Sequence, residues 1–84
     1  MYIEELIQFA VGSGPWLFKH NNIISGHDGT ILSSLADQIA FNANQLTEKQ
    51  GHLALRVLNK HRAELRSAVP LIDDILDKPT WKIL

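Results

Sequence analysis

The sequence predicts an all-α domain, a small orthogonal bundle of about four helices with a long aromatic-bearing loop between helices 1 and 2. Three observations support this prediction. Apolar residues recur at helical spacing in several segments, a capping-box pattern opens the longest of them, and clusters of turn-forming residues separate them. The chain has 84 residues, of which 45% are hydrophobic, and this suits one compact core. We therefore expect residues 1–84 to form a single helical domain.

The first predicted helix spans residues 2–11. Glu4 and Glu5 lie in its first turn, where the helix dipole favours negative charge. The run 12–15, Gly-Ser-Gly-Pro, ends the helix. At about 100° per residue, one face collects the apolar side chains of Ile3, Leu6, Ile7, Ala10 and Val11.

Residues 12–29 form the long connection, which is rich in turn-forming residues and also contains large apolar side chains. A connection of this length in a small domain usually has its own packing or a function. We expect Trp16 and Phe18 to insert into the core, because a small domain needs large apolar anchors. The alternative is that these two rings are platforms on which single-stranded bases stack.

The second predicted helix spans residues 30–43 and is entered through the sequence Asp28-Gly29-Thr30. Asn42 and Asn44 suit its C-terminal end. Phe41 lies off the apolar stripe, which makes it a candidate exposed anchor for a protein partner. The stripe itself is made of Ile31, Leu32, Leu35, Ala36, Ile39 and Ala43.

The third predicted helix spans residues 48–66 and has the strongest signal. The Thr47 hydroxyl can accept a hydrogen bond from the N–H of Gln50, while the Gln50 side chain reaches back to the N–H of Thr47. His61 lies on the apolar face, and we expect it to be a core-edge histidine with one hydrogen-bond partner. The rest of that face is formed by Ala54, Val57, Leu58 and Leu65.

A short fourth helix is predicted over residues 70–77. It starts at Pro70, because proline is favoured at the first helical position, and Pro79 stops it. Asp73 and Asp74 lie in its first turn, where the helix dipole accounts for both. We expect Trp81 in the following apolar tail to pack against the domain, and it is a second candidate protein contact.

The third predicted helix is also the most basic segment. Residues 47–66 have a net charge of +3, whereas residues 1–46 have −3 and residues 67–84 have −1. A basic stripe opposite the apolar face can follow a phosphate backbone, and the alternative is a solvated face. The candidate nucleic-acid-binding residues are Lys49, His52, Arg56 and Lys60, and Asn59 lies among them.

Two arginines flank this stripe and have a second interpretation. Arg62 and Arg66 could pair internally with Asp73, Asp74 or Asp77. In that case the positive charge of the segment would exceed the charge available to a ligand.

Several function classes receive no support from the sequence. There is no cysteine, so disulfides and thiolate metal sites are excluded, and the histidine spacing predicts no metal site. No nucleophile elbow, phosphate-binding loop, zinc-protease helix or motor-ATPase motif is present. We therefore expect no enzyme activity and no cofactor. The apolar runs are too short to span a membrane, and the N-terminus lacks the basic start of a signal peptide, so the cytoplasm is the expected location.

Several segments together resemble a known module. They run from Ile31 to Ile39, from Leu46 to Gln50, from Leu53 to Arg62 and from Lys78 to Lys82, and Gly14-Pro15-Trp16 fits the upstream part. This pattern is similar to the N-terminal helical module of bacteriophage helicases of the SNF2 and DEAD/DEAH type. Gly51 stands where that module usually has alanine, and His61 where it usually has an aromatic residue.

The resemblance implies a role beside phage DNA processing, in replication, recombination or repair, without ATPase activity in these 84 residues. We accordingly expect a non-catalytic accessory module of a helicase that contacts DNA or arranges the helicase domains, in the host cytoplasm if phage-encoded. The alternative is a protein-interaction domain that docks on a motor domain or on another phage or host protein through Phe41 and Trp81.

Overall fold

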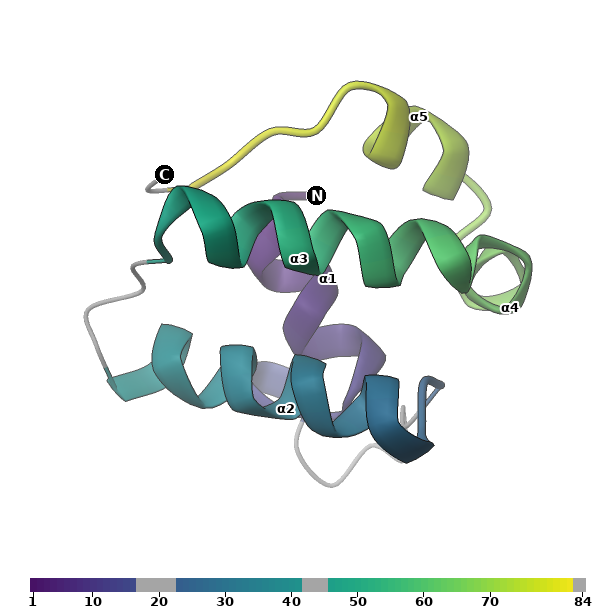
Figure 1. Ribbon diagram of the computed structural model, residues 1–84. Coiled ribbons are helices and arrows are strands. Elements are labelled where there is room, and N and C mark those ends of the chain that lie inside the picture. Colours follow the sequence, from purple (N-terminus) through teal and green to yellow (C-terminus); the bar gives the residue numbers. More distant parts are fainter. Residues whose placement is uncertain (17–22, 42–45, 83–84) are drawn as a thin grey trace.

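The computed structural model describes residues 1–16, 23–41 and 46–82 (Figure 1). Within these ranges the chain forms five α-helices and one short 3-10 helix, and no strand. The all-α class is therefore confirmed. The elements are α1 (Ile3–Ala10), η1 (Gly14–Trp16), α2 (Gly26–Phe41), α3 (Glu48–Lys60), α4 (Arg62–Ala68) and α5 (Ile72–Asp77).

Helix α1 lies at the centre of the fold. Its apolar face is fully buried, with Ile3, Leu6, Ile7 and Ala10 all at 0% exposure. Helix α1 crosses behind α2 and α3, and α5 covers the side of α3 that faces away from α2 (Figure 1). The surrounding elements contribute one core to this face, with fully buried side chains that include Leu32, Ala36, Ala54, Leu58, Leu65 and Ile72.

Hydrogen bonds fix both ends of α1 to segments that are distant in sequence. The N–H of Ile3 donates to the carbonyl of Thr80 at 2.9 Å, and the carbonyl of Ala10 accepts from the N–H groups of Ile23 and Ile24 at 2.9 and 3.3 Å. The buried Glu4 carboxylate also accepts from the N–H of Lys82 at 2.8 Å. Helix α1 therefore holds the C-terminal segment in place.

Helix α2 begins four residues earlier than predicted, so the expected turn at Asp28-Gly29 is wrong. Gly26 has a φ of +70°, a conformation that suits glycine, and the helix starts there. The Thr30 hydroxyl donates to the carbonyl of Gly26 at 3.1 Å, and the N–H of Gly29 donates to the carbonyl of Ser25 at 3.2 Å. The predicted end at Asn42 and Asn44 lies outside the described residues.

The third predicted helix is interrupted at His61, so the expectation of one helix over 48–66 is wrong. The capping box at its start is confirmed, since Gln50 N–H donates to the Thr47 hydroxyl at 3.2 Å and Thr47 N–H to the Gln50 side chain at 2.9 Å. At His61 the N–H is shared between the carbonyls of Val57 and Leu58. Helix α4 then leaves the axis of α3 (Figure 1).

The aromatic residues and the last helix also differ in detail from the prediction. Trp16 is only half-buried and packs edge-to-face on Phe9, with ring centroids 5.6 Å apart, so it lies at the edge of the core. Phe18 lies outside the described residues. Helix α5 begins at Ile72 and not at Pro70. Trp81 packs against the core as expected.

We predict that Gly29→Ala destabilises the domain although alanine is the better helix former. A Cβ atom at residue 29 would lie 2.7 Å from the carbonyl oxygen of Ile24, which is backbone and cannot rotate away. Overpacking of this kind costs about 1–3 kcal/mol, more than the ~1 kcal/mol that helix propensity returns. Urea unfolding checks this, with the exposed Ser33→Ala in the same helix as control. An unchanged or raised midpoint for Gly29→Ala would contradict the close approach.

Candidate nucleic-acid interface

The predicted basic stripe is exposed along α3. Lys49, His52, Arg56 and Lys60 all lie on the solvent side of the helix, opposite the buried Ala54 and Leu58. Within the part of the chain that the structure describes, Lys49 and Arg56 make no ion pair. Lys60 differs, because its Nζ atom lies 3.1 Å from Oδ2 of Asp28. The stripe therefore offers two unpaired cations and one that is shared with a carboxylate.

Arg62 and Arg66 pair internally, as the second interpretation of the sequence proposed. Asp73 bonds to Arg62 at 2.9 Å and to both Nε and Nη2 of Arg66 at 3.1 and 2.9 Å. Asp77 bonds to Arg62 at 3.1 Å. The two arginines lower the pKa of Asp73, and the Asp73 carboxylate raises the pKa of each guanidinium. These contacts connect α4 to α5 and remove two of the five cations from the predicted stripe region.

His61 is bonded on both ring nitrogens, so the expectation of one partner is wrong. Nε2 lies 2.8 Å from Oδ2 of Asp28 on α2, and Nδ1 lies 2.9 Å from Oε2 of Glu64 on α4. A neutral imidazole has one N–H and can donate to only one carboxylate, so both bonds require the protonated ring. The hydrogen bonds that the ring donates to Asp28, and to a smaller extent to Glu64, raise the pKa of His61. The hydrogen bonds that Asp28 accepts from His61, and to a smaller extent from Lys60, lower the pKa of Asp28.

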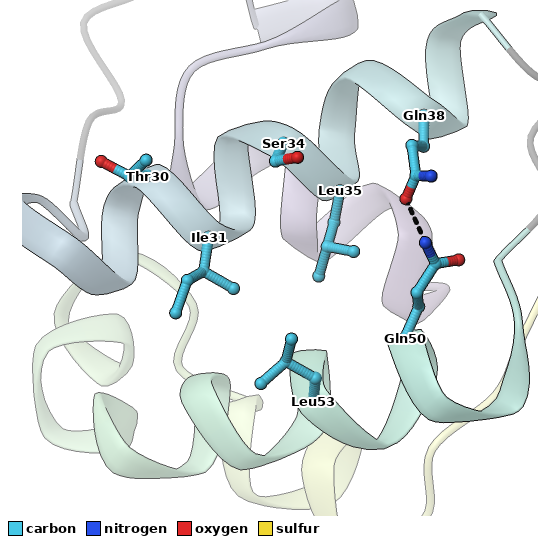
Figure 2. Close-up of a pocket in the computed structure, with 7 residues that line it drawn as sticks. All are labelled: Thr30, Ile31, Ser34, Leu35, Gln38, Gln50 and Leu53. Carbon is cyan, nitrogen blue, oxygen red and sulfur yellow. Dashed lines mark hydrogen bonds between the residues drawn. The ribbon is translucent and has the colours of Figure 1, made fainter.

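A shallow groove lies between α2 and α3 on one side of the stripe. Figure 2 shows Ile31 and Leu35 pointing from α2 toward Leu53 on α3, while the side chains of Gln38 and Gln50 bond to each other at one end. The groove has a volume of about 480 Å³. Phe41 follows Gln38 by one helical turn and is 83% exposed. Thr30 and Ser34 complete the lining.

A second cleft lies on the other side of the stripe, between α3 and the C-terminal segment. It has a volume of about 490 Å³. The C-terminal segment runs back above α3 toward the start of that helix (Figure 1), so residues far apart in sequence meet here. Sequence reasoning assigned His52 to the stripe and Trp81 to a protein contact and did not bring them together. The cleft is lined by Glu48, His52, Leu55, Pro79 and Trp81.

Among the described residues, no group of three or more histidine, aspartate or glutamate side chains is arranged to hold a metal ion. In the same ranges, no helix combines the length and the apolar character that crossing a bilayer requires.

The chain was also compared with known proteins. No protein-family model, no curated protein and no solved structure matches it.

We predict that the stability of the domain falls as the pH rises above neutral. A raised folded-state pKa of His61 contributes stability in full below its ordinary value of 6.5, and this contribution is lost as the pH rises through the raised pKa. The lowered pKa of Asp28 acts at the other end, since its contribution is present above 3.8 and is lost as the pH falls through the lowered value. Urea midpoints measured between about pH 2 and pH 9 cover the loss of stability at both the acid and the alkaline end.

Two variants separate His61 from the other titrating groups. His61→Gln should reduce the loss of stability at alkaline pH, whereas His52→Gln, which changes an exposed histidine on α3, should leave that loss unchanged. If the urea midpoint of His61→Gln falls at alkaline pH as much as that of the wild type, His61 is not the group responsible.

Proposed function

We propose that this domain is a non-catalytic accessory module of a phage DNA-processing helicase and that it contacts DNA through α3. The observation that carries the proposal is the exposed pair Lys49 and Arg56. These side chains lie about two helical turns apart and have no ion-pair partner within the described ranges, whereas Arg62 and Arg66 are neutralised by Asp73 and Asp77. His52 lies between the two free cations, and Lys60 extends the stripe by one turn.

The size of this surface indicates modest binding. The chain has a net charge of −1, so attraction to DNA is local to α3. Each neutralised phosphate contributes about −0.9 to the slope of log K against log salt for duplex DNA and about −0.7 for a single strand. Two or three contacts give a weak interaction with a salt slope of roughly −1.4 to −2.7, which suits a module that assists a motor in holding DNA and does not bind DNA alone.

In this proposal the module positions the DNA or the motor domains and catalyses no reaction itself. The motor domains of the helicase would hydrolyse nucleotide, and the module would hold DNA beside them or arrange them, in the host cytoplasm. We interpret the helices as an orthogonal bundle that presents α3 on one side. The resemblance described above supports the helicase assignment, and the exposed stripe supports the DNA contact.

We predict that Lys49→Gln with Arg56→Gln weakens DNA binding and lowers its salt dependence. Loss of two phosphate contacts should reduce the salt slope by roughly 1.4 for a single strand. Fluorescence anisotropy with labelled DNA at four salt concentrations measures this, and circular dichroism confirms the fold. The broader triple change of Lys49, Arg56 and Lys60 to glutamate should abolish binding.

The matched control is Arg66→Gln. It removes one positive charge, half of what the double variant removes, from an arginine that is already bonded to Asp73. If this variant lowers affinity as much as the double variant does, net charge and not the stripe governs the interaction. If the double variant binds as the wild type does, the DNA-contact proposal fails.

A second candidate function is docking on a protein, either a helicase motor domain or another phage or host protein. The specific observation in its favour is Phe41, a large apolar side chain that is 83% exposed. It lies about one helical turn after Gln38, which lines the groove between α2 and α3. Large aromatic anchors of this type dominate many protein interfaces. Trp81 is the other residue assigned to this function, although it is more deeply packed.

For this candidate we predict that Phe41→Ala weakens association with a helicase motor domain by about 30-fold, the equivalent of about 2 kcal/mol at a central aromatic contact. The effect should vary little with salt, and the free energy of unfolding should change by less than about 0.5 kcal/mol because the side chain is exposed. Calorimetry measures the association, and the exposed neighbour Ala40→Ser is the control. Equal affinity for both variants would exclude Phe41 as an anchor.

A further inference from the structure

The cleft between α3 and the C-terminal segment joins directly onto the basic stripe. His52 belongs to both, because it lines the cleft and lies on α3 three residues after Lys49 and four before Arg56. Residues at these spacings lie on one face of a helix. A polyanion held by Lys49 and Arg56 would therefore pass along the rim of the cleft.

The aromatic wall of the cleft is held in a fixed position. Trp81 is flanked by two residues whose backbones bond to α1. The Thr80 carbonyl accepts from Ile3 at 2.9 Å, and the Lys82 N–H donates to the buried Glu4 carboxylate at 2.8 Å. Trp81 is half-buried and packs against the core, yet it still lines an open cleft of about 490 Å³. A rigid, partly exposed indole can stack a base at little entropic cost.

We propose that this cleft binds one unstacked base of a DNA single strand whose phosphates contact Lys49 and Arg56. The base stacks on Trp81 beside His52. Within a duplex both faces of each internal base are covered by its neighbours, so a single strand delivers a base into the cleft without the cost of unpairing it. This inference rests on the proposed function and adds the form of the DNA and the position of a base.

Glu48 gives the cleft a preference among bases. Glu48 lines the same cleft, and its carboxylate can only accept hydrogen bonds when ionised. Cytosine presents an exocyclic amino group that donates to such a carboxylate, whereas thymine presents a carbonyl at the same position. The same negative charge opposes phosphate, so Glu48 selects the base at some cost in affinity. Cytosine-containing strands should therefore bind more tightly than thymine strands.

The first experiment measures the binding of labelled 12-nucleotide dC and dT strands and of a 12-base-pair duplex at low and moderate salt. We expect the order dC strand, dT strand, duplex, from tightest to weakest. Trp81→Ala should weaken single-strand binding roughly fivefold or more, as loss of one stacked base does. It should leave duplex binding unchanged, and Trp81→Phe should restore most of the loss. Glu48→Ala should abolish the difference between dC and dT while raising the affinity for dT.

A second experiment leaves Trp81 in place and does not depend on the fold of a Trp81 variant. The chain has two tryptophans, so Trp16→Phe makes Trp81 the only one, and saturating dC strand should quench its emission. Unchanged emission at saturation, or equal affinity for single strand and duplex, overturns the base cleft while the salt-sensitive DNA contact stands. Absence of salt-sensitive binding to every DNA overturns the proposed function and the cleft together.

Discussion

The burial of α1 is the constraint on which the rest of this structure depends. A helix of eight residues is not stable alone in water, so α1 exists because its apolar face is completely enclosed by the other elements. Its first turn in turn supplies the groups that hold residues 80 and 82, and its last residue accepts from both Ile23 and Ile24. The apolar packing of α1 and the hydrogen bonds at its two ends therefore stabilise each other. The start of the chain positions the C-terminal segment.

The two hollows beside the basic stripe follow from this arrangement. The groove exists because α2 and α3 both pack on α1 while their outer edges, at Ile31 and Leu53, remain apart. The cleft exists because α1 draws residues 80–82 back above the start of α3. Neither hollow could be predicted from the pattern of one segment, since each lies between elements that meet only in the folded chain.

The sequence pattern predicted those parts of the fold that depend on interactions between residues close together in the chain. The capping box at Thr47 and Gln50 involves residues three apart, and the apolar faces of α1, α2 and α3 follow helical spacing. The interruption at His61 was missed because the neighbouring sequence does not mark it, and the contact of His61 with Asp28 joins residues 33 apart in the chain. The early start of α2 was missed because Gly29 is usually a turn signal, and only the nearby Ile24 carbonyl explains its place inside a helix.

The charge available to a ligand also depends on contacts between residues that are distant in the sequence. The net charge of +3 over residues 47–66 describes the sequence correctly but not the surface, because the position of each carboxylate decides which cations are available. Asp73 and Asp77 neutralise two arginines and Asp28 shares Lys60, so a ligand meets mainly Lys49 and Arg56. Two cations cannot provide both affinity and selectivity. If this surface discriminates among polyanions, the discrimination must come from the neighbouring groups that recognise a base and not a phosphate.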